Sequence, residues 1–558
     1  MTSGRLSTLL PLTLLLLLWS VIIVVINPIG EFMINDDWSF TLVVEDLLTN
    51  KTFTTTGWAG GPAALVHILW GTLWSLIFGF SVSALRCATL FLAICTSIAL
   101  LILLKDRFRS SWIVLLYTLT LTVNPLFLSQ SFTFMTDITF VAMVVVALLF
   151  ISWGIEKNHY PLLITGFFFS LLATLTRQLG LAIPLAFLVT VFLHPPLKTM
   201  SRRHLSLVAV LVGIVPWLSC ELWLATLETS VANHPVVQRI FAYPVEKGVF
   251  DYGIFLLSQA GVIWLYCGFF LSPLLIIHQN KLRSIHPLRK LIILITFFFC
   301  LFELAIILGY ISPPTGFYKN IIYNFGIGPI LLKDNYLLGI TRNVSLPPPI
   351  FYMVIWYATI SALALGYLLV RSIRQLIVTV PPNHATGLSF RGLLCLICLI
   401  IYSGTILLTG FHDRYLIPLM VFLIVWLADH QTPSFEAQKS MLIATSIVLF
   451  IGLLSTLSIR DFMTIKHSQY QATHDILNER DLSPCEIDGG FEHNGYHCSN
   501  QKKPTVTGTY SWWWVTQEKY LVSLGPMADY HVVHQVPYRL ILGYDGAIHI
   551  LQPINPGK

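Results

Sequence analysis

Long apolar runs, separated by shorter polar segments, recur along most of this 558-residue chain. An α-helix needs about 20 apolar residues to cross a bilayer, and several of these runs reach that length. Charged residues make up 11% of the chain and hydrophobic residues 55%, whereas an average soluble domain has about 25% charged residues. The pattern excludes a soluble globular protein and predicts a polytopic α-helical membrane protein.

About thirteen runs are candidate spans. The first, Leu6–Ile26, has no small-residue cleavage site before Asn27-Pro28, so we interpret it as an uncleaved first span and not as a signal peptide. The later candidates are 82–104, 112–127, 138–155, 160–175, 179–194, 205–224, 254–277, 290–310, 350–370, 392–410, 415–428 and 440–459. Several of them are short, and the division of 160–194 into two spans stays open.

Lys and Arg residues gather in alternate connections between these runs, as expected of cytoplasmic loops. With a cytoplasmic N-terminus, the inside loops hold Lys105, Arg107, Arg109, Lys157, Lys198, Arg202, Arg203, Lys281, Arg283, Arg289, Lys290, Arg371, Arg374, Arg391 and Lys439. This arrangement accounts for the net charge of +6 without a nucleic-acid partner. An odd number of spans then places the C-terminal segment outside.

The sequence predicts a transmembrane domain over residues 1–459 with three long outer loops. These loops, 28–81, 225–253 and 311–349, are too long to be simple connectors. In the first of them, Pro62–Phe80 is apolar, and we expect it to lie along the membrane interface. Counting it as a span would invert every later loop and move the basic clusters outside.

Hydropathy falls sharply after Ile459, which predicts a soluble domain over residues 460–558. Glycine-containing turns and short alternating stretches there are typical of a small α/β or β-rich domain. Cys485 and Cys498 lie in this polar segment and could form a disulfide on the oxidising side of a membrane. The other seven cysteines lie in or beside apolar runs, where a thiol behaves as a small hydrophobic group.

Three acids recur at the predicted outer face. Asp36 and Asp37 follow the first span, and Asp137 opens a later one. Each could simply cap a helix, since carboxylates favour helix N-termini. Their recurrence at one face of an apolar bundle favours a functional role, because acids in such places are costly unless they are solvated or paired.

Cations recur at the same face. Arg86, Arg177 and Arg414 lie at the ends of predicted spans, where each could also reach lipid head groups or pair with an acid. Together they indicate anion binding, because a guanidinium presents several fixed donors to the oxygens of a phosphate. His67 and His412 are weaker candidates, since histidines at such positions are more often structural.

Five short motifs follow one another in a fixed order along the chain. They are Asn35-Asp36-Asp37-Trp38, Phe78-Gly79 leading to Ala84-Leu85-Arg86, Met135-Thr136-Asp137, Arg177-Gln178-Leu179-Gly180 and Asp413-Arg414-Tyr415-Leu416-Ile417-Pro418. With the predicted topology, this set resembles the GT-C membrane glycosyltransferases over roughly residues 1–430. It is most similar to the protein O-mannosyltransferase and aminoarabinose (lipid A) transferase branch, often called glycosyltransferase family 39-like.

The resemblance implies a GT-C-like fold and a transfer of sugar from a polyprenyl-phosphate donor to a lipid, glycan or protein acceptor. The transfer would take place at the outer face with inversion at the anomeric carbon. By this resemblance the catalytic acids are Asp36, its neighbour Asp37, and Asp137. The donor-phosphate residues are Arg86, Arg177, Arg414 and Tyr415, and further substrate-binding candidates are His67, His412 and Asp413. No cofactor is required, although the three acids could instead hold a divalent cation.

The sequence departs from the family pattern in two places. Asp36-Asp37 stands where the family usually has Asp-Glu, and Gly60-Gly61-Pro62-Ala63 replaces a Lys/His-Pro-Pro-Leu element. The C-terminal segment matches no transferase element. The resemblance therefore does not give the sugar or the acceptor. We expect the protein to lie in a bacterial inner membrane, with the site and the C-terminal domain on the periplasmic side.

Two other functions compete with the transferase. A transporter or lipid flippase would use the same charges to line a translocation path, but such proteins often show repeated halves and charges near the midplane. Here the charges concentrate at one face and no repeat is evident. A non-catalytic assembly factor, which would recruit partners through the C-terminal domain, is the third interpretation.

Overall fold

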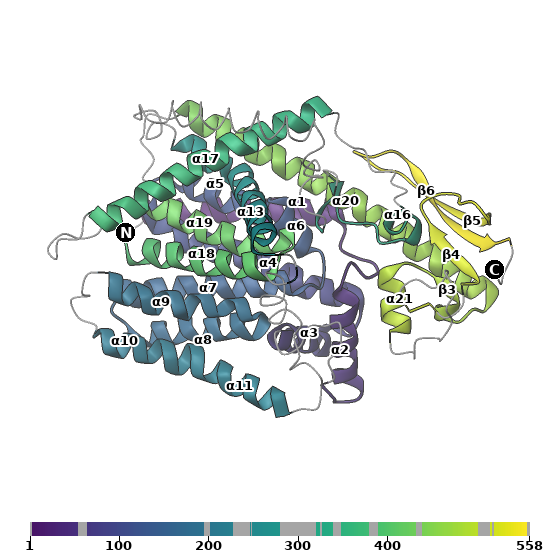
Figure 1. Cartoon of the computed structure of the whole chain (residues 1–558), viewed down its shortest axis with the longest axis horizontal. Helices are drawn as coiled ribbons and strands as arrows, with labels where there is room; N and C mark the ends of the chain where they lie inside the picture. The colour runs from purple at the N-terminus through teal and green to yellow at the C-terminus, as the bar shows by residue number, and fades with distance from the viewer. Residues whose placement is uncertain are drawn as a thin grey trace.

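The structure is a computed structural model of the whole chain, in which most of the predicted helices can be followed (Figure 1). It describes residues 3–53, 64–194, 201–226, 246, 248–278, 320–323, 326–338, 348–378, 389–430, 438–499, 514–515 and 518–554. The expected span 290–310, the element 60–63, most of the loop 225–253 and much of the loop 311–349 lie outside these residues.

The chain is an integral membrane protein built mainly from apolar helices. Among the described residues, eight helices are long and apolar enough to cross a membrane, or nine if a bent pair is one span. The long elements are α1 (Ser3–Ile26), α4 (Val82–Leu104), α7 (Thr136–Glu156), α10 to α11 (Arg202–Val208 to Val215–Thr226), α13 (Val249–Ile277), α17 (Pro348–Val378), α18 (Phe390–Thr409) and α20 (Gln438–Arg480). The expected count of thirteen is not established by these residues.

The remaining apolar helices are shorter. The bent pair is α5 (Ser111–Thr122) with α6 (Pro125–Ser131), which meet at an angle of 67°. Pro125 begins the second helix of this pair, where its missing N–H costs nothing. The others are α3 (Leu65–Phe78), α8 (Tyr160–Thr176), α9 (Ala182–Leu193) and α19 (Ile417–His430).

Two helices form the centre of the bundle. Helix α7 is apolar on every side, and most of its residues are buried against neighbours that include α8 and α4. Helix α19 is buried along most of its length and packs against α18. The polar turns that precede α7 and α19 therefore emerge from rigid helices at one end of the bundle, which is where the candidate site lies.

The segment between α1 and α4 forms a cap over that end of the bundle. It contains α2 (Asp37–Thr49) and α3, which pack on each other. Helix α3 includes most of the apolar stretch Pro62–Phe80, which was expected to lie along the membrane interface. At 14 residues it is shorter than a typical span.

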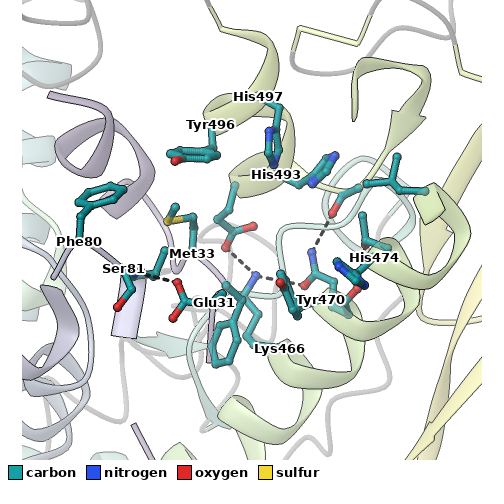
Figure 2. A pocket seen from close by; sticks show the side chains of 17 residues that line it. Glu31, Met33, Phe80, Ser81, Lys466, Tyr470, His474, His493, Tyr496 and His497 are labelled. Carbon is teal, nitrogen blue, oxygen red and sulfur yellow. Dashed lines mark hydrogen bonds and ion pairs between the residues drawn. The ribbon is translucent and has the colours of Figure 1, made fainter. Parts of the chain in front are cut away.

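Helix α20 joins the membrane domain to the C-terminal domain. It spans 43 residues, crosses the expected boundary at residue 459 without a break, and ends at Arg480 (Figure 1). A cavity lies where its second half meets the cap and helix α21 (Phe491–Cys498) (Figure 2). The apolar helix bundle and the C-terminal domain are thus connected by one continuous helix.

A small mixed sheet completes the C-terminal domain, in agreement with the expected α/β or β-rich fold. Its strands are β3 (Ile487–Asp488), β4 (Tyr520–Ser523), β5 (Tyr530–Tyr538) and β6 (Gly546–Pro553), in the order β3-β4-β6-β5. The β3–β4 pair is parallel and the other two pairs are antiparallel. Helix α16 (Lys333–Tyr336) docks here, because Asp334 accepts a hydrogen bond from the Leu524 amide at 2.8 Å.

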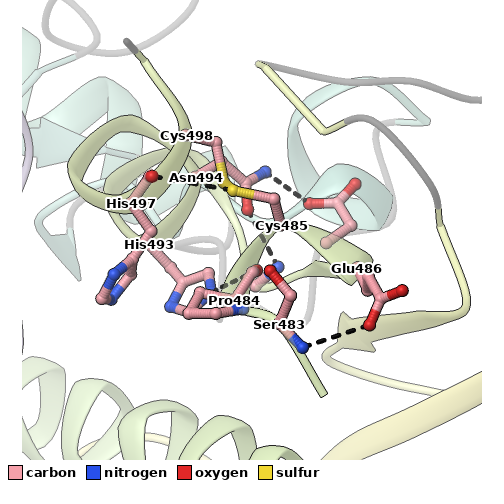
Figure 3. The surroundings of a disulfide bond; sticks show 10 residues. Ser483, Pro484, Cys485, Glu486, His493, Asn494, His497 and Cys498 are labelled. Atoms are coloured by element: carbon pink, nitrogen blue, oxygen red, sulfur yellow. Dashed lines mark hydrogen bonds between the residues drawn. A yellow bond between two sulfur atoms is a disulfide. The ribbon is translucent and has the colours of Figure 1, made fainter. Parts of the chain in front are cut away.

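A disulfide joins Cys485 and Cys498 across 13 positions of sequence (Figure 3). Closing a loop of this size restricts the unfolded chain, and such bonds typically contribute about 2–4 kcal/mol. We therefore expect the Cys485→Ser/Cys498→Ser variant to make residues 483–554 more sensitive to limited proteolysis in detergent. Cys95→Ser, which changes a cysteine in α4, serves as the control. Equal digestion rates for both variants would contradict the prediction.

Candidate active site

Two acids and two arginines meet at one end of the bundle. Asp36 precedes α2, Asp137 lies in the first turn of α7, Arg177 follows α8, and Arg414 precedes α19. Arg414 Nη2 lies 3.3 Å from Asp36 Oδ2, and Arg414 Nε lies 3.8 Å from Asp137 Oδ2. Arg177 Nη2 is 2.9 Å from the same Asp137 oxygen. The structure thus brings together four residues that are far apart in the sequence.

The two acids differ in their access to solvent. The Asp36 side chain is 25% exposed, whereas that of Asp137 is 2% exposed between the two guanidinium groups. A buried carboxylate held by two cations is suited to orienting those cations, since it loses most of its freedom. Asp36 is the acid of this cluster that an incoming molecule can reach.

Arg414 retains unused hydrogen-bonding capacity. In the part of the chain that the structure describes, its buried Nη1 and Nε atoms have no hydrogen-bond acceptor. Buried polar groups are normally hydrogen-bonded, and an anion with several oxygens would satisfy such a guanidinium. The cluster is therefore chemically suited to a phosphate.

An aromatic ring supports both arginines. The Arg177 and Arg414 guanidinium groups lie 4.8 and 5.8 Å from the centre of the Tyr415 ring, within the range of cation–π contacts. Tyr402, which lies in none of the five motifs, donates a hydrogen bond to the Tyr415 carbonyl at 3.1 Å. Tyr415 was expected to bind phosphate, and in the structure it lies beneath the groups that could do so.

Asp413 and His412 flank the cluster in different ways. Asp413 is buried and accepts hydrogen bonds from the backbone amides of Ile321, Ile322 and Arg414. It ties the outer segment 320–323 to the site, and the substrate contact expected of it stays a prediction. His412 is exposed and packs edge-on against Tyr415 at 5.7 Å.

Asp37 is not part of this cluster, although it is adjacent to Asp36. Its buried carboxylate accepts hydrogen bonds from the Ile34 amide at 2.7 Å and the Phe134 amide at 3.5 Å. Burial raises the pKa of Asp37 to about 7, while the charge of Arg86 and these amides act to lower it. Asp37 therefore lies apart from the arginine cluster, where its contacts fix the cap against the bundle, and the catalytic role expected for it stays a prediction.

Arg86 also lies outside the cluster. The side chain is fully buried and donates hydrogen bonds to the carbonyls of Pro28, Gly30 and Phe32. Its guanidinium also lies 4.5 Å from the centre of the Phe32 ring. These contacts brace the chain that leads to Asp36. The donor-phosphate role expected for Arg86 stays a prediction.

His67 lies inside the cap. Its ring is buried, contacts Thr139 Oγ1 at 2.8 Å and the Phe134 carbonyl at 3.2 Å, and stacks on Phe134. These contacts join α3 to α7 and leave no face of the ring for a substrate. His67 is thus a packing residue of the cap in this structure, and the substrate-binding role expected for it stays a prediction.

The side chains do not fit a cation site formed by Asp36, Asp37 and Asp137. The first and third face arginines, and the second is occupied by backbone amides. In the described ranges, no group of three or more His, Cys, Asp and Glu side chains could hold a metal ion.

The role of Arg86 as a brace leads to a prediction about stability. We expect Arg86→Met to lower the thermal stability of the protein in detergent, because each buried carbonyl left without a donor costs about 1–3 kcal/mol. The fraction that stays soluble after heating measures this change. Arg374→Met, which alters an exposed arginine on α17, is the control. An unchanged melting temperature for Arg86→Met would show that the carbonyl contacts are not needed.

Comparison with known proteins supports the resemblance found in the motifs. Residues 63–223 match the family model described as dolichyl-phosphate-mannose-protein mannosyltransferase. This segment includes Asp137 and Arg177, while Asp36 and Arg414 lie outside it. The match confirms the resemblance to GT-C glycosyltransferases and supports a transferase in general terms. No curated protein matches the sequence.

Two solved structures are similar to this one at low sequence identity. ArnT from Cupriavidus metallidurans bound to undecaprenyl phosphate has a TM-score of 0.43 and 12% identity, over 86% of this chain and 73% of that chain. The oligosaccharyltransferase AglB from Archaeoglobus fulgidus, in complex with an inhibitory peptide and a dolichol-phosphate, has a TM-score of 0.41 and 14% identity, over 90% of this chain and 61% of that chain.

Proposed function

We propose that this protein transfers a sugar from a polyprenyl-phosphate donor to an acceptor of the cell envelope, with inversion at the anomeric carbon. The observation that carries the proposal is the cluster in which Arg414 links Asp36 to Asp137. An accessible carboxylate beside the buried, incompletely paired guanidinium group of Arg414 provides a base and a phosphate site together. The match to the mannosyltransferase family model agrees with this chemistry.

In the proposed reaction, an acceptor hydroxyl attacks the anomeric carbon as its proton passes to the Asp36 carboxylate. The bond between that carbon and the phosphate oxygen breaks, and the polyprenyl phosphate leaves with the bonding electrons. Arg414 and Arg177 stabilise the charge that develops on the phosphate, and Asp137 holds the two cations in place. The acceptor oxygen and the leaving phosphate lie on opposite faces of the sugar, which gives inversion.

The setting of the reaction is part of the proposal. The active site and the C-terminal domain face the periplasm or cell exterior of a bacterial inner membrane, because the basic clusters of the sequence fall in the opposite loops. The polyprenyl tail lies in the bilayer beside the bundle. The positive charge comes from arginines and no divalent cation takes part, so activity should survive EDTA.

The test is consumption of a lipid-linked sugar by purified protein in vesicles. Undecaprenyl-phosphate and dolichyl-phosphate sugars are supplied one at a time, with envelope extract as the acceptor source, and free polyprenyl phosphate is measured by mass spectrometry. We expect polyprenyl phosphate to be released from one of the two classes of lipid-linked sugar, and none to be released in protein-free vesicles. If no donor is consumed while the lipids cross the bilayer, the protein is a flippase and the proposal is wrong.

A further inference from the structure

The cavity at the domain junction is separate from the arginine cluster. Its volume is about 380 Å³, within the range of small-molecule sites. Figure 2 shows its wall, to which three parts of the chain contribute: the cap, the second half of α20, and α21. None of Asp36, Asp137, Arg177 and Arg414 lines it.

Aromatic side chains from all three parts line this cavity. Phe80 comes from the cap, Tyr470 from α20 and Tyr496 from α21 (Figure 2). Rings of this kind offer flat apolar faces, and a small number of polar groups among them fixes the orientation of a ligand. The lining therefore suits a molecule that has both apolar faces and hydroxyl groups.

The key polar group in the lining is Glu492. Its side chain is 3% exposed, and Oε1 accepts hydrogen bonds from Lys466 Nζ at 2.7 Å and from the Asn35 amide at 3.1 Å. The other oxygen, Oε2, is buried and has no hydrogen-bond partner within the described residues. A buried acceptor of this kind is costly to leave unpaired, and a hydroxyl donor would satisfy it. Because Lys466 already balances the charge, a neutral hydroxyl suits the site better than a cation.

The same carboxylate also supports the turn that presents Asp36. Asn35 has a φ of 57°, a left-handed conformation that asparagine tolerates better than most residues. Its amide is held by Glu492, and its side chain donates to Asn320 Oδ1 at 3.2 Å. A ligand that hydrogen-bonds to Oε2 would therefore be linked through Glu492 to Asn35, the residue before Asp36.

We infer that the junction cavity binds a carbohydrate part of the acceptor, with Glu492 Oε2 accepting a hydrogen bond from one of its hydroxyl groups. This inference rests on the proposed transferase function. The aromatic lining packs against the sugar rings, and the cap connects the bound glycan to the catalytic turn. The acceptor class is thus a glycan, in preference to a peptide or a free lipid.

The test separates the acceptor from the donor. Glycans released from the cell envelope and freed of lipid and protein serve as acceptor, and release of polyprenyl phosphate without acceptor reports hydrolysis of the donor by water. In Tyr470→Ala we expect the KM for the glycan fraction to rise about tenfold, while donor hydrolysis stays within twofold of wild type. Tyr544→Ala, an exposed tyrosine of the C-terminal domain, is the matched control.

A second variant tests the carboxylate without leaving a buried charge. Glu492→Gln combined with Lys466→Met removes both charges and keeps a side-chain carbonyl that can accept the Asn35 amide hydrogen. We expect the same rise in the glycan KM, with donor hydrolysis preserved. The inference is overturned if the KM for the glycan is unchanged in both variants, or if the acceptor activity resides in the protein fraction of the envelope. In either case, donor turnover by the wild-type protein would still support the transferase function. Absence of donor turnover in the wild type would instead refute the proposed function.

Discussion

Replacing Asp36 with Asn should lower kcat for sugar transfer by a factor of about 10²–10⁴, the usual contribution of a general base. The amide is nearly isosteric with the carboxylate but cannot take up the proton of the acceptor hydroxyl. The Asp36 side chain is partly exposed and makes its ion pair at 3.3 Å, so we expect little change in thermal stability. Initial rates of polyprenyl phosphate release at saturating donor and acceptor measure the effect.

Asp46→Asn is the matched control for this substitution. Asp46 lies in the same helix, where its carboxylate accepts a hydrogen bond from Asn50 at 3.3 Å, away from the arginines. It should retain wild-type activity. If Asp36→Asn kept more than about a tenth of the rate, Asp36 would not be the base.

The second large effect is expected for Arg414→Lys, which should lower kcat/KM for the donor by a factor of about 10²–10³. Lysine keeps the positive charge between Asp36 and Asp137, but it lacks the planar fork that can contact an acid and a phosphate at once. The loss should therefore appear in donor turnover, with and without acceptor. Rates measured over a range of donor concentrations separate kcat from KM.

Arg460→Lys provides the control for the change from arginine to lysine. Arg460 lies on α20 and pairs with the neighbouring Asp461 at 3.0 Å, in contact with the C-terminal domain and remote from the candidate site. Its replacement should leave donor turnover unchanged. Full activity of Arg414→Lys would show that a point charge suffices and that the unused guanidinium atoms have no role.

Hydropathy predicted the helices of the membrane domain better than it predicted their ends. Helix α20 continues to Arg480, well past the fall in hydropathy after Ile459. The segment 460–480 contains no glycine or proline, so nothing in it interrupts a helix that has already formed. Hydropathy reports the solvent around a helix and not its length, which is why the expected boundary fell inside α20.

The order of the motifs predicted which loops carry the site, but not which side chains point into it. Asp36 and Asp37 are neighbours at the start of a helix, where successive side chains point in different directions, so one reaches solvent and the other is buried. Arg86 could not be distinguished from Arg414 in the sequence, because its carbonyl partners are more than 50 residues away. Glu492 is 457 residues from Asn35, and no local sequence pattern predicts that contact.

The contact between Asp36 and Arg414 has a kinetic consequence. The Asp36 carboxylate accepts a hydrogen bond from the Arg414 guanidinium, and an arriving phosphate would compete for that guanidinium. The lipid-linked sugar should therefore have to bind first and free the carboxylate before the hydroxyl of the second substrate can be activated. Product-inhibition patterns would reveal such a compulsory order.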